Sequence, residues 1–373
     1  MHSNDSLTSI PPAAQIVTPS GLTTAQYVGL SLDVGRKAFS ADGVIGLLTR
    51  MSELGFTALH LHLTETYRVG VQLPGFEELA AEDAWDRADA ARIVAAADAT
   101  GIAVIPEIDL PSHAAALLVG REHLRLTDRH GVVHQDRLDI SLPEALEFAL
   151  ALLEAAAELF PGEAIHLGGD EFFAAPWEGE DEQHPERFPS LVEHARREAG
   201  PAATALDSYA LFINALTARA QELGRIPMLW NDHVVPASEQ PVVPISSDVV
   251  VDVWVRWREW TPSVHDYLDS GHRVVNSNGD LLYFVLSGDG LPEPHGRRRF
   301  GLLEDTFAPR RFMGRAAQDH HLDVAPAPAG TRDPVLGASM SAWCDAPDVL
   351  GEQETWDLLD TWLGPFARVM RRG

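Results

Sequence analysis

The stretch "AIHLGGDEFF" (164–173) joins an apolar run to two glycines and two adjacent acids, Asp170 and Glu171. A short apolar run of this kind predicts a buried strand that ends where the glycines begin. On an extended strand neighbouring side chains point to opposite faces, so the two carboxylates could not both reach one bond. Gly168 and Gly169 can adopt backbone conformations that other residues avoid, so we expect the strand to turn at its end.

The same pattern of an apolar run followed by polar residues recurs along the chain. Strands are predicted over 27–34, 58–64, 103–109, 164–171, 227–233, 249–255, 273–279 and 337–343. Helices are predicted between strands, among them 40–55, 87–101, 142–160 and 208–224. Eight strand–helix repeats favour an α/β fold, the (β/α)8 TIM barrel, over a doubly wound sheet. Residues 172–205 and 280–335 predict long βα loops.

The composition excludes several classes of partner. The chain has 373 residues, 45% of them hydrophobic, and a formal net charge of −27 that repels phosphate backbones and anionic membranes. We expect a small neutral or cationic ligand, no nucleic acid and no membrane partner, with the chain a monomer or homodimer. The N-terminus lacks the features of a secretory signal, so a cytoplasmic location is expected. We predict a loosely ordered lead-in over 1–22 and one catalytic barrel over 23–373, without a separate accessory domain.

Polar and aromatic side chains gather where the predicted strands end, and in a TIM barrel these ends share one face. Rings that stack on pyranose faces and charged groups that bind hydroxyls suit a sugar. Glycoside cleavage needs an acid that protonates the leaving oxygen and a group that stabilises positive charge on the sugar. The strand-end residues are Asp33, Arg36, His62, Glu65, Glu107, Asp109, His113, Asp170, Glu171, Trp230, Asp232, Trp254, Asn276, Asn278, Trp343 and Asp345.

The motif "HLGGDE" (166–171) resembles the active-site signature of glycoside hydrolase family 20, the β-N-acetylhexosaminidases. The segments "NSNGDLLYF" (276–284) and "SMSAWCDAP" (339–347) resemble a single-barrel branch of exo-β-N-acetylglucosaminidases, which favours GlcNAc over GalNAc as substrate. Further segments that resemble the family, in chain order, are "GLSLDVGRKAFS" (29–40), "LHLHLT" (59–64), "VIPEIDLPSHAAAL" (104–117), "LWNDH" (229–233) and "VWVRW" (253–257).

The resemblance implies a retaining, substrate-assisted mechanism without metal or cofactor, in which the sugar's own acetamido oxygen is the nucleophile. Asp170 would orient the acetamido nitrogen, and Glu171 would act as general acid and then as general base. Asp109, His166 and Glu65 would support these acids, with Asp109 and His113 forming a network behind them. Trp257, Trp260 and Trp362 match no motif and are expected in the barrel core. Substrate-binding residues are implied to be Arg36, His113, Trp230, Asp232, Trp254, Tyr283, Trp343 and Asp345.

The chain departs from the family pattern at several positions. Ser112 stands where the family commonly has glycine, and we expect this small residue to be harmless. Glu65 is only an approximate counterpart of the family's acid after the second strand. Asp345 replaces a glutamate, and the usual acid two residues after Tyr283 is missing. Both departures make the residues that bind the sugar's outer hydroxyls, and so the choice between GlcNAc and GalNAc, less well defined by the resemblance.

Three other functions fit parts of the sequence. His60 and His62 are two residues apart on a strand and share a face, as in a metal-dependent amidohydrolase-type barrel. A non-catalytic carbohydrate-binding barrel is the second alternative, although both acids are present. A Schiff-base aldolase would depend on Lys37, the chain's single lysine.

Overall fold

The computed structural model describes residues 26–173, 184–235, 241–256, 261–288, 301–314 and 321–372. The predicted lead-in over 1–22 and the tryptophans Trp257 and Trp260 lie outside the described residues. Trp362 is 4% exposed, but it lies on the outer helix α10 (Glu352–Met370) and packs on Phe284, so its burial is between helix and barrel and not in the predicted barrel core.

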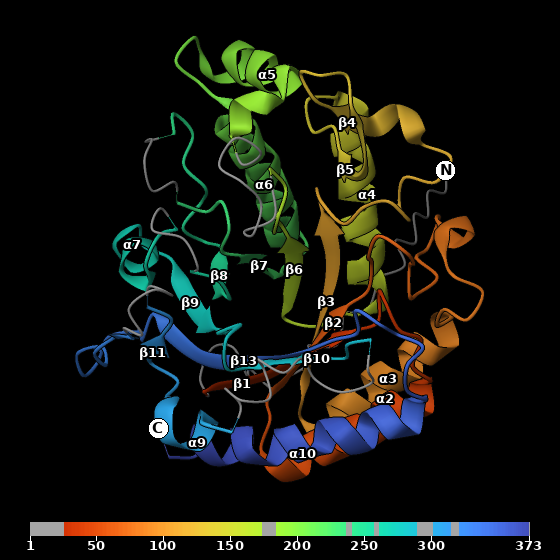
Figure 1. The fold of residues 1–373 in the computed structure, drawn as a ribbon, viewed down its shortest axis with the longest axis vertical. Coiled ribbons are helices and arrows are strands. Elements are labelled where there is room, and N and C mark those ends of the chain that lie inside the picture. Colours follow the sequence, from red (N-terminus) through yellow and green to blue (C-terminus); the bar gives the residue numbers. More distant parts are fainter. Residues whose placement is uncertain are drawn as a thin grey trace, which may run out of the picture.

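Eight parallel strands close into a barrel, which confirms the predicted TIM-barrel fold (Figure 1). Each strand pairs with the next along the chain, and the first strand also pairs with the last over Tyr27–Leu32 and Gly337–Ala342. The barrel strands are β1 (Tyr27–Asp33), β2 (Ala58–His62), β3 (Ala103–Leu110), β6 (Ala164–Gly168), β7 (Ile226–Trp230), β8 (Val250–Val253), β9 (Arg273–Asn276) and β13 (Val335–Trp343).

The seventh position of the barrel is occupied by two short strands rather than one. β9 pairs with the start of β13, through Val274 to Asn276, and β10 (Tyr283–Val285) pairs with the end of β13. The prediction placed one strand over 273–279 and a loop from 280, so it missed β10. The break brings Tyr283 beside Ser341, close to the carboxyl end of the barrel.

Helices cover the outside of the barrel. α2 (Ala41–Leu54) begins at Ser40, whose side chain accepts a hydrogen bond from the Gly43 amide, and ends at the left-handed Gly55. Helices α2, α3 (Arg87–Thr100) and α10 (Glu352–Met370) lie against one face, while α4 (Pro143–Leu159) and α6 (Ala205–Glu222) cover the other side (Figure 1). α7 (Val264–Asp269) and α9 (Leu303–Thr306) are shorter. No helix within the described ranges has both the length and the apolar content that crossing a bilayer requires.

The predicted long loops contain secondary structure of their own. The segment 172–205, predicted as a loop, includes α5 (Pro189–Ala199), which packs on α6. The segment 280–335 includes β10, α9 and the hairpin of β11 (Arg311–Phe312) and β12 (Leu322–Asp323). Between β3 and α4 lies a second hairpin, β4 (Arg125–Thr127) and β5 (Val133–Leu138). Short elements with mixed polarity do not produce a clear periodic signal.

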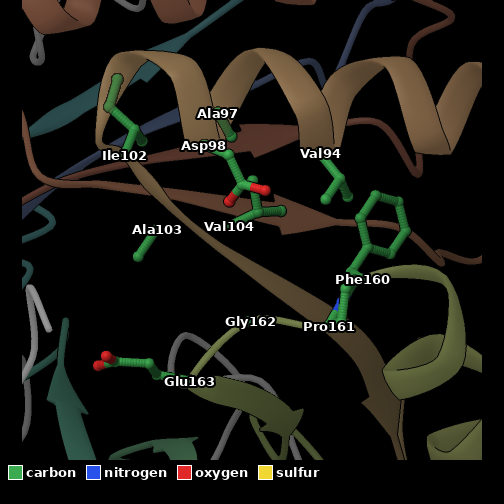
Figure 2. Close-up of a pocket in the computed structure, with 10 residues that line it drawn as sticks. All are labelled: Val94, Ala97, Asp98, Ile102, Ala103, Val104, Phe160, Pro161, Gly162 and Glu163. Carbon is green, nitrogen blue, oxygen red and sulfur yellow. The ribbon is translucent and has the colours of Figure 1, made fainter. Parts of the chain in front are cut away.

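The interior of the barrel is apolar at one end and polar at the other. Buried side chains near the amino ends of the strands form a small hydrophobic layer that includes Tyr27, Ile105 and Met228. At that same end a cavity of about 80 Å³ lies between α3, the start of β3 and the turn before β6, lined by Val94 and Phe160 among others (Figure 2). The candidate catalytic residues follow the opposite, carboxyl ends of the strands.

Candidate active site

The backbone turns sharply at the end of β6, as the two glycines predict. Gly168 and Gly169 have φ of 75° and 97°, and Glu171 also has a positive φ of 54°. A Cβ on Gly168 would lie 2.1 Å from Oδ1 of Asp109, and a Cβ on Gly169 would lie 2.6 Å from the Tyr209 hydroxyl. Both positions therefore need glycine for space as well as for conformation. The turn presents Asp170 and Glu171 together, with side chains 17% and 15% exposed.

His113 connects the two acids to a buried glutamate. Its Nδ1 lies 2.8 Å from Oε1 of Glu65, while its Nε2 lies 3.6 Å from Asp170 and 3.5 Å from Glu171. Burial favours neutral imidazole, but the charges of Glu65, Asp170 and Asp109 raise the pKa of His113 well above its ordinary value. The predicted support residue Glu65 thus contacts the catalytic acids through His113.

Arg36 lies on the other side of Glu65. Its guanidinium donates to Asp33 at 2.9 Å and lies 2.5 Å from Oε1 of Glu65, while Oδ1 of Asp345 is 4.0 Å away. The guanidinium also lies over the Trp343 ring, 5.5 Å from its centroid. Burial opposes its charge, but Asp33 and Glu65 raise the pKa of Arg36, so it is a fixed cation. The Asp345 side chain is 58% exposed and forms the open edge of this group.

Glu65 is held as an anion by its neighbours. The residue is 1% exposed, and burial alone would raise the pKa of its carboxyl. The charges of His113 and Arg36, with a contribution from His62, instead lower the pKa of Glu65 well below its ordinary value. Glu65, predicted as an approximate counterpart of the family's acid, thus lies between Arg36 and His113.

Asp109 lies buried behind Asp170. The residue is 0% exposed, and neither of its carboxylate oxygens has a hydrogen-bond donor among the described residues. One ligand-type atom from each of Asp109, His113 and Asp170 lies within 4.8 Å of the other two. Burial raises the pKa of Asp109 well above its ordinary value, and the charge of Asp170 raises it further. Burial also raises the pKa of Asp170, against the charge of His113.

A second buried group lies deeper in the barrel around Glu107. Its carboxylate accepts a hydrogen bond from Nε1 of Trp230 at 2.7 Å and is hydrogen-bonded to Nδ1 of His62. Ring nitrogens of His60 and His166 lie 3.1 Å and 3.0 Å from the same carboxylate. Burial opposes ionisation, but His62, His166 and His60 lower the pKa of Glu107 well below its ordinary value. His166, predicted as a support residue, contacts both Glu107 and the Trp230 ring, and its Nδ1 also accepts a hydrogen bond at 3.1 Å from the amide of Gly168, in the turn that carries the acids.

Four aromatic residues predicted to bind substrate come together at the carboxyl end of the barrel. Trp254 stacks on Tyr283 with ring centroids 6.0 Å apart and an interplanar angle of 6°. Trp343 contacts Tyr283 edge to face at 5.8 Å and lies 6.1 Å from Trp230. These side chains come from β7, β10 and β13 and from the residue after β8, so the barrel itself fixes their arrangement.

Asp232, also predicted to bind substrate, has protein partners for both carboxylate oxygens. Oδ1 accepts from the Glu171 amide at 3.2 Å, and Oδ2 accepts from Nε1 of Trp254 at 2.6 Å. Burial and the charges of Asp170 and Glu171 raise the pKa of Asp232 well above its ordinary value. The geometry thus makes Asp232 a link between the turn and the aromatic cluster.

One group of three residues and the single lysine bear on the alternative functions. Atoms of His60, Glu107 and His166 lie within 4.8 Å of one another and could hold a metal ion. Glu107, however, already accepts a hydrogen bond from Trp230. Lys37 is 7% exposed, and its Nζ donates to the carbonyl oxygens of Pro347 at 2.5 Å and Leu350 at 2.8 Å. An amine held in this way is not presented to a carbonyl substrate.

Some residues of the site have no assigned role in the sequence prediction. Glu107 carries a visible signal, because it is an acid within an apolar strand and shares a face with Asp109. Tyr209 has none, since it lies on helix α6 and reaches the turn only through the fold.

Comparisons of sequence and of structure found similar known proteins. Residues 26–348 match the family model described as the catalytic domain of glycosyl hydrolase family 20. The chain is 25% identical over 344 residues to a lacto-N-biosidase of Bifidobacterium bifidum, covering 91% of this chain and 28% of that protein. It is 23% identical over 349 residues to a β-hexosaminidase of Vibrio furnissii, covering 86% of this chain and 52% of that protein. The chain thus spans about a quarter to a half of these relatives' lengths.

The solved structure of Dispersin B has the same fold. The two superpose with a TM-score of 0.71 at 18% sequence identity, covering 93% of this chain and 100% of that one. The agreement over 93% of this chain and the whole of the other supports a closed barrel.

Proposed function

The chain belongs to glycosyl hydrolase family 20, and from this premise we propose that it is a retaining exo-β-N-acetylhexosaminidase that releases terminal β-linked GlcNAc by substrate-assisted catalysis. The observation that carries the proposal is the turn at 168–171, which presents two acids side by side in different surroundings. Asp170 lies against buried Asp109, whereas Glu171 has its amide on Asp232, and His113 lies beside both acids. Two acids placed in this way suit two different targets on one sugar.

In the first step the acetamido carbonyl oxygen of the substrate attacks its own anomeric carbon, and the glycosidic C–O bond breaks. Glu171 donates its proton to the leaving oxygen, while Asp170 accepts a hydrogen bond from the acetamido N–H and balances the charge of the oxazolinium ion. Burial and the charge of Asp170 favour the protonated form of Asp109, which would donate to Asp170 and so help Asp170 keep the negative charge.

In the second step water attacks the anomeric carbon and opens the oxazolinium ring. Glu171, now a carboxylate, accepts the proton of that water, and the sugar leaves with retained configuration. Protonated His113, 3.5 Å from Glu171, stabilises the carboxylate that exists between the steps. Glu65 keeps His113 charged throughout the cycle.

The aromatic cluster and Arg36 would bind different parts of the sugar. Trp230, Trp254 and Trp343 would surround the acetamido group, and the Tyr283 hydroxyl would donate to its oxygen. Arg36, a fixed cation at the other end of Trp343, would bind the sugar's outer hydroxyls with its planar set of donors. Asp345 lies at the exposed edge of the same group.

The test is hydrolysis of chromogenic β-GlcNAc, β-GalNAc, β-glucose and β-lacto-N-bioside substrates side by side. We expect fast cleavage of β-GlcNAc, and inhibition by a thiazoline mimic of the oxazolinium at low concentration. Cleavage of β-glucose as fast as β-GlcNAc would refute the mechanism, because glucose lacks the acetamido nucleophile. The β-lacto-N-bioside arm is included because the chain is similar to a lacto-N-biosidase along 91% of its length. Full activity after chelator treatment would exclude the metal-dependent alternative.

A further inference from the structure

Three side chains from three different elements hold the backbone of the catalytic turn. The Tyr209 hydroxyl, on α6, donates to the carbonyl oxygen of Gly169 at 2.7 Å. The Ser112 hydroxyl, after β3, donates to the carbonyl oxygen of Asp170. The amide of Glu171 donates to Oδ1 of Asp232, after β7, at 3.2 Å. Three consecutive residues thus each have one backbone group fixed by a side chain distant in sequence.

The turn needs such restraint because its conformation is unfavourable. Glu171 is not glycine, and a positive φ of 54° costs such a residue about 1 to 2 kcal/mol relative to the right-handed region. If the peptide rotated to relieve this strain, the Asp170 and Glu171 side chains would change direction. Placement of a reacting group is sensitive to shifts of about 1 Å.

The hydrogen bonds are separate from the packing that keeps the turn folded. Phe172 and Phe173, directly after Glu171, are 0% and 1% exposed. Their rings pack on Phe188 and on the ring of Tyr209. Loss of a single hydroxyl would therefore leave this aromatic anchor in place and alter only the direction of the peptide groups.

Ser112 is the most informative of the three residues. Ser112 stands where the family commonly has glycine and was expected to be harmless. In the structure, however, its hydroxyl donates to the carbonyl oxygen of Asp170 on the catalytic turn. Glycine has no side-chain donor, so this contact is a property of the present chain. Asp232 adds a second connection, because its other oxygen accepts from Nε1 of Trp254 in the aromatic cluster.

We propose that Ser112, Tyr209 and Asp232 are positioning residues for the reaction, which act on Asp170 and Glu171 through the backbone of residues 169–171. This inference rests on the proposed hexosaminidase function for its kinetic consequences. Its structural consequence, a restrained turn, can be measured without any activity.

The variants are Ser112→Ala, Ser112→Gly, Tyr209→Phe and Asp232→Asn. Ser112→Ala and Tyr209→Phe remove one hydroxyl each, and we expect kcat for β-GlcNAc substrates to fall about tenfold to a hundredfold, with KM within about twofold of the parent. Amide hydrogen exchange across 164–173 should become several-fold faster, because the turn loses the stabilising free energy of one hydrogen bond. Asp232→Asn should also alter the binding of the thiazoline mimic, since it disturbs Trp254.

Ser208→Ala is the matched control. Ser208 is also a buried serine whose hydroxyl donates to a backbone carbonyl, that of Leu191 at 2.6 Å, and its other hydrogen-bond partner is Nδ1 of His194 at 2.8 Å, so both partners lie on α5 and not on the turn. We expect this control to leave kcat and exchange across 164–173 unchanged, and melting temperatures will show whether each variant is folded.

The outcomes separate this inference from the proposed function. An active parent whose Ser112→Ala and Tyr209→Phe variants keep both kcat and the exchange rate would overturn the positioning role. A parent without activity on any β-GlcNAc substrate would refute the proposed function alone. In that case faster exchange in the variants would still support the restraint of the turn, and unchanged exchange would overturn it.

Discussion

Replacement of Glu65 by glutamine tests whether the charge of Glu65 keeps His113 protonated beside the catalytic acids. The substitution keeps the shape of the side chain but removes the negative charge 2.8 Å from Nδ1 of His113. In the parent protein Glu65, together with Asp170 and Asp109, raises the pKa of His113 well above its ordinary value against the effect of burial. We therefore expect the pKa of His113 to fall in Glu65→Gln.

The size of the effect follows from the distance and the burial of the pair. An opposite charge within hydrogen-bond distance changes a pKa by about 1 to 3, which equals about 1.4 to 4 kcal/mol. Glu65 is 1% exposed, so water screens this interaction little, and the pKa of His113 should fall clearly in the variant. The protonated form of a histidine is lost as the pH rises through its pKa. Where kcat/KM depends on the charge of His113, its alkaline limb should therefore move to lower pH.

The direct assay is NMR titration of the imidazole signals. The chain has 16 histidines, so His113→Gln is needed to assign the relevant signal. Glu144→Gln is the control, because Glu144 pairs with the exposed His123 at 3.1 Å, away from the site. If the pKa of His113 is the same in Glu65→Gln and in the parent, the proposed effect of Glu65 on His113 is refuted, whatever the variant does to the rate.

Three other substitutions give distinct outcomes. Glu171→Gln should lower kcat about 100-fold or more for substrates with poor leaving groups and far less for activated aryl glycosides, as steady-state kinetics across leaving groups will show. Asp170→Asn should lower kcat with every leaving group and weaken thiazoline binding; equal thiazoline affinity would contradict its role. Burial raises the pKa of Asp252 from 3.8 to about 6, which costs the folded state about 3 kcal/mol at neutral pH. This cost appears as the pH rises from 3.8 to about 6, so Asp252→Asn should raise the melting temperature at pH 7.5 but not at pH 3.5.

The strands and the catalytic turn were predictable because their signals are local. Apolar runs of strand length mark all eight barrel positions, and the glycine pair before Asp170 marks the turn. Where the structure differs from the prediction, the cause lies in contacts between segments that are distant in the sequence. β10 lies in the apolar run 281–286, which is a strand signal of its own, but its place in the sheet depends on β13 extending past β9 and offering a stretch for pairing.

The same distinction holds for the site. Arg36, His113 and the aromatic residues follow strand ends, so topology alone brings them together. Tyr209 and Ser112 act on the backbone of another segment, and such a contact depends on the direction of a helix or loop rather than on a motif. Asp232 was predicted at the site, but its partners on Glu171 and Trp254 are visible only in three dimensions.

The single lysine of the chain has a practical consequence for handling the protein. Lys37 is buried, and both of its hydrogen bonds join the end of the first strand to the segment after the last one. Reagents that acylate or crosslink side-chain amines will therefore find no exposed lysine on the folded barrel. Slow modification of Lys37 would report the opening of the seam where the barrel closes, so a simple labelling time course can follow local unfolding at that seam.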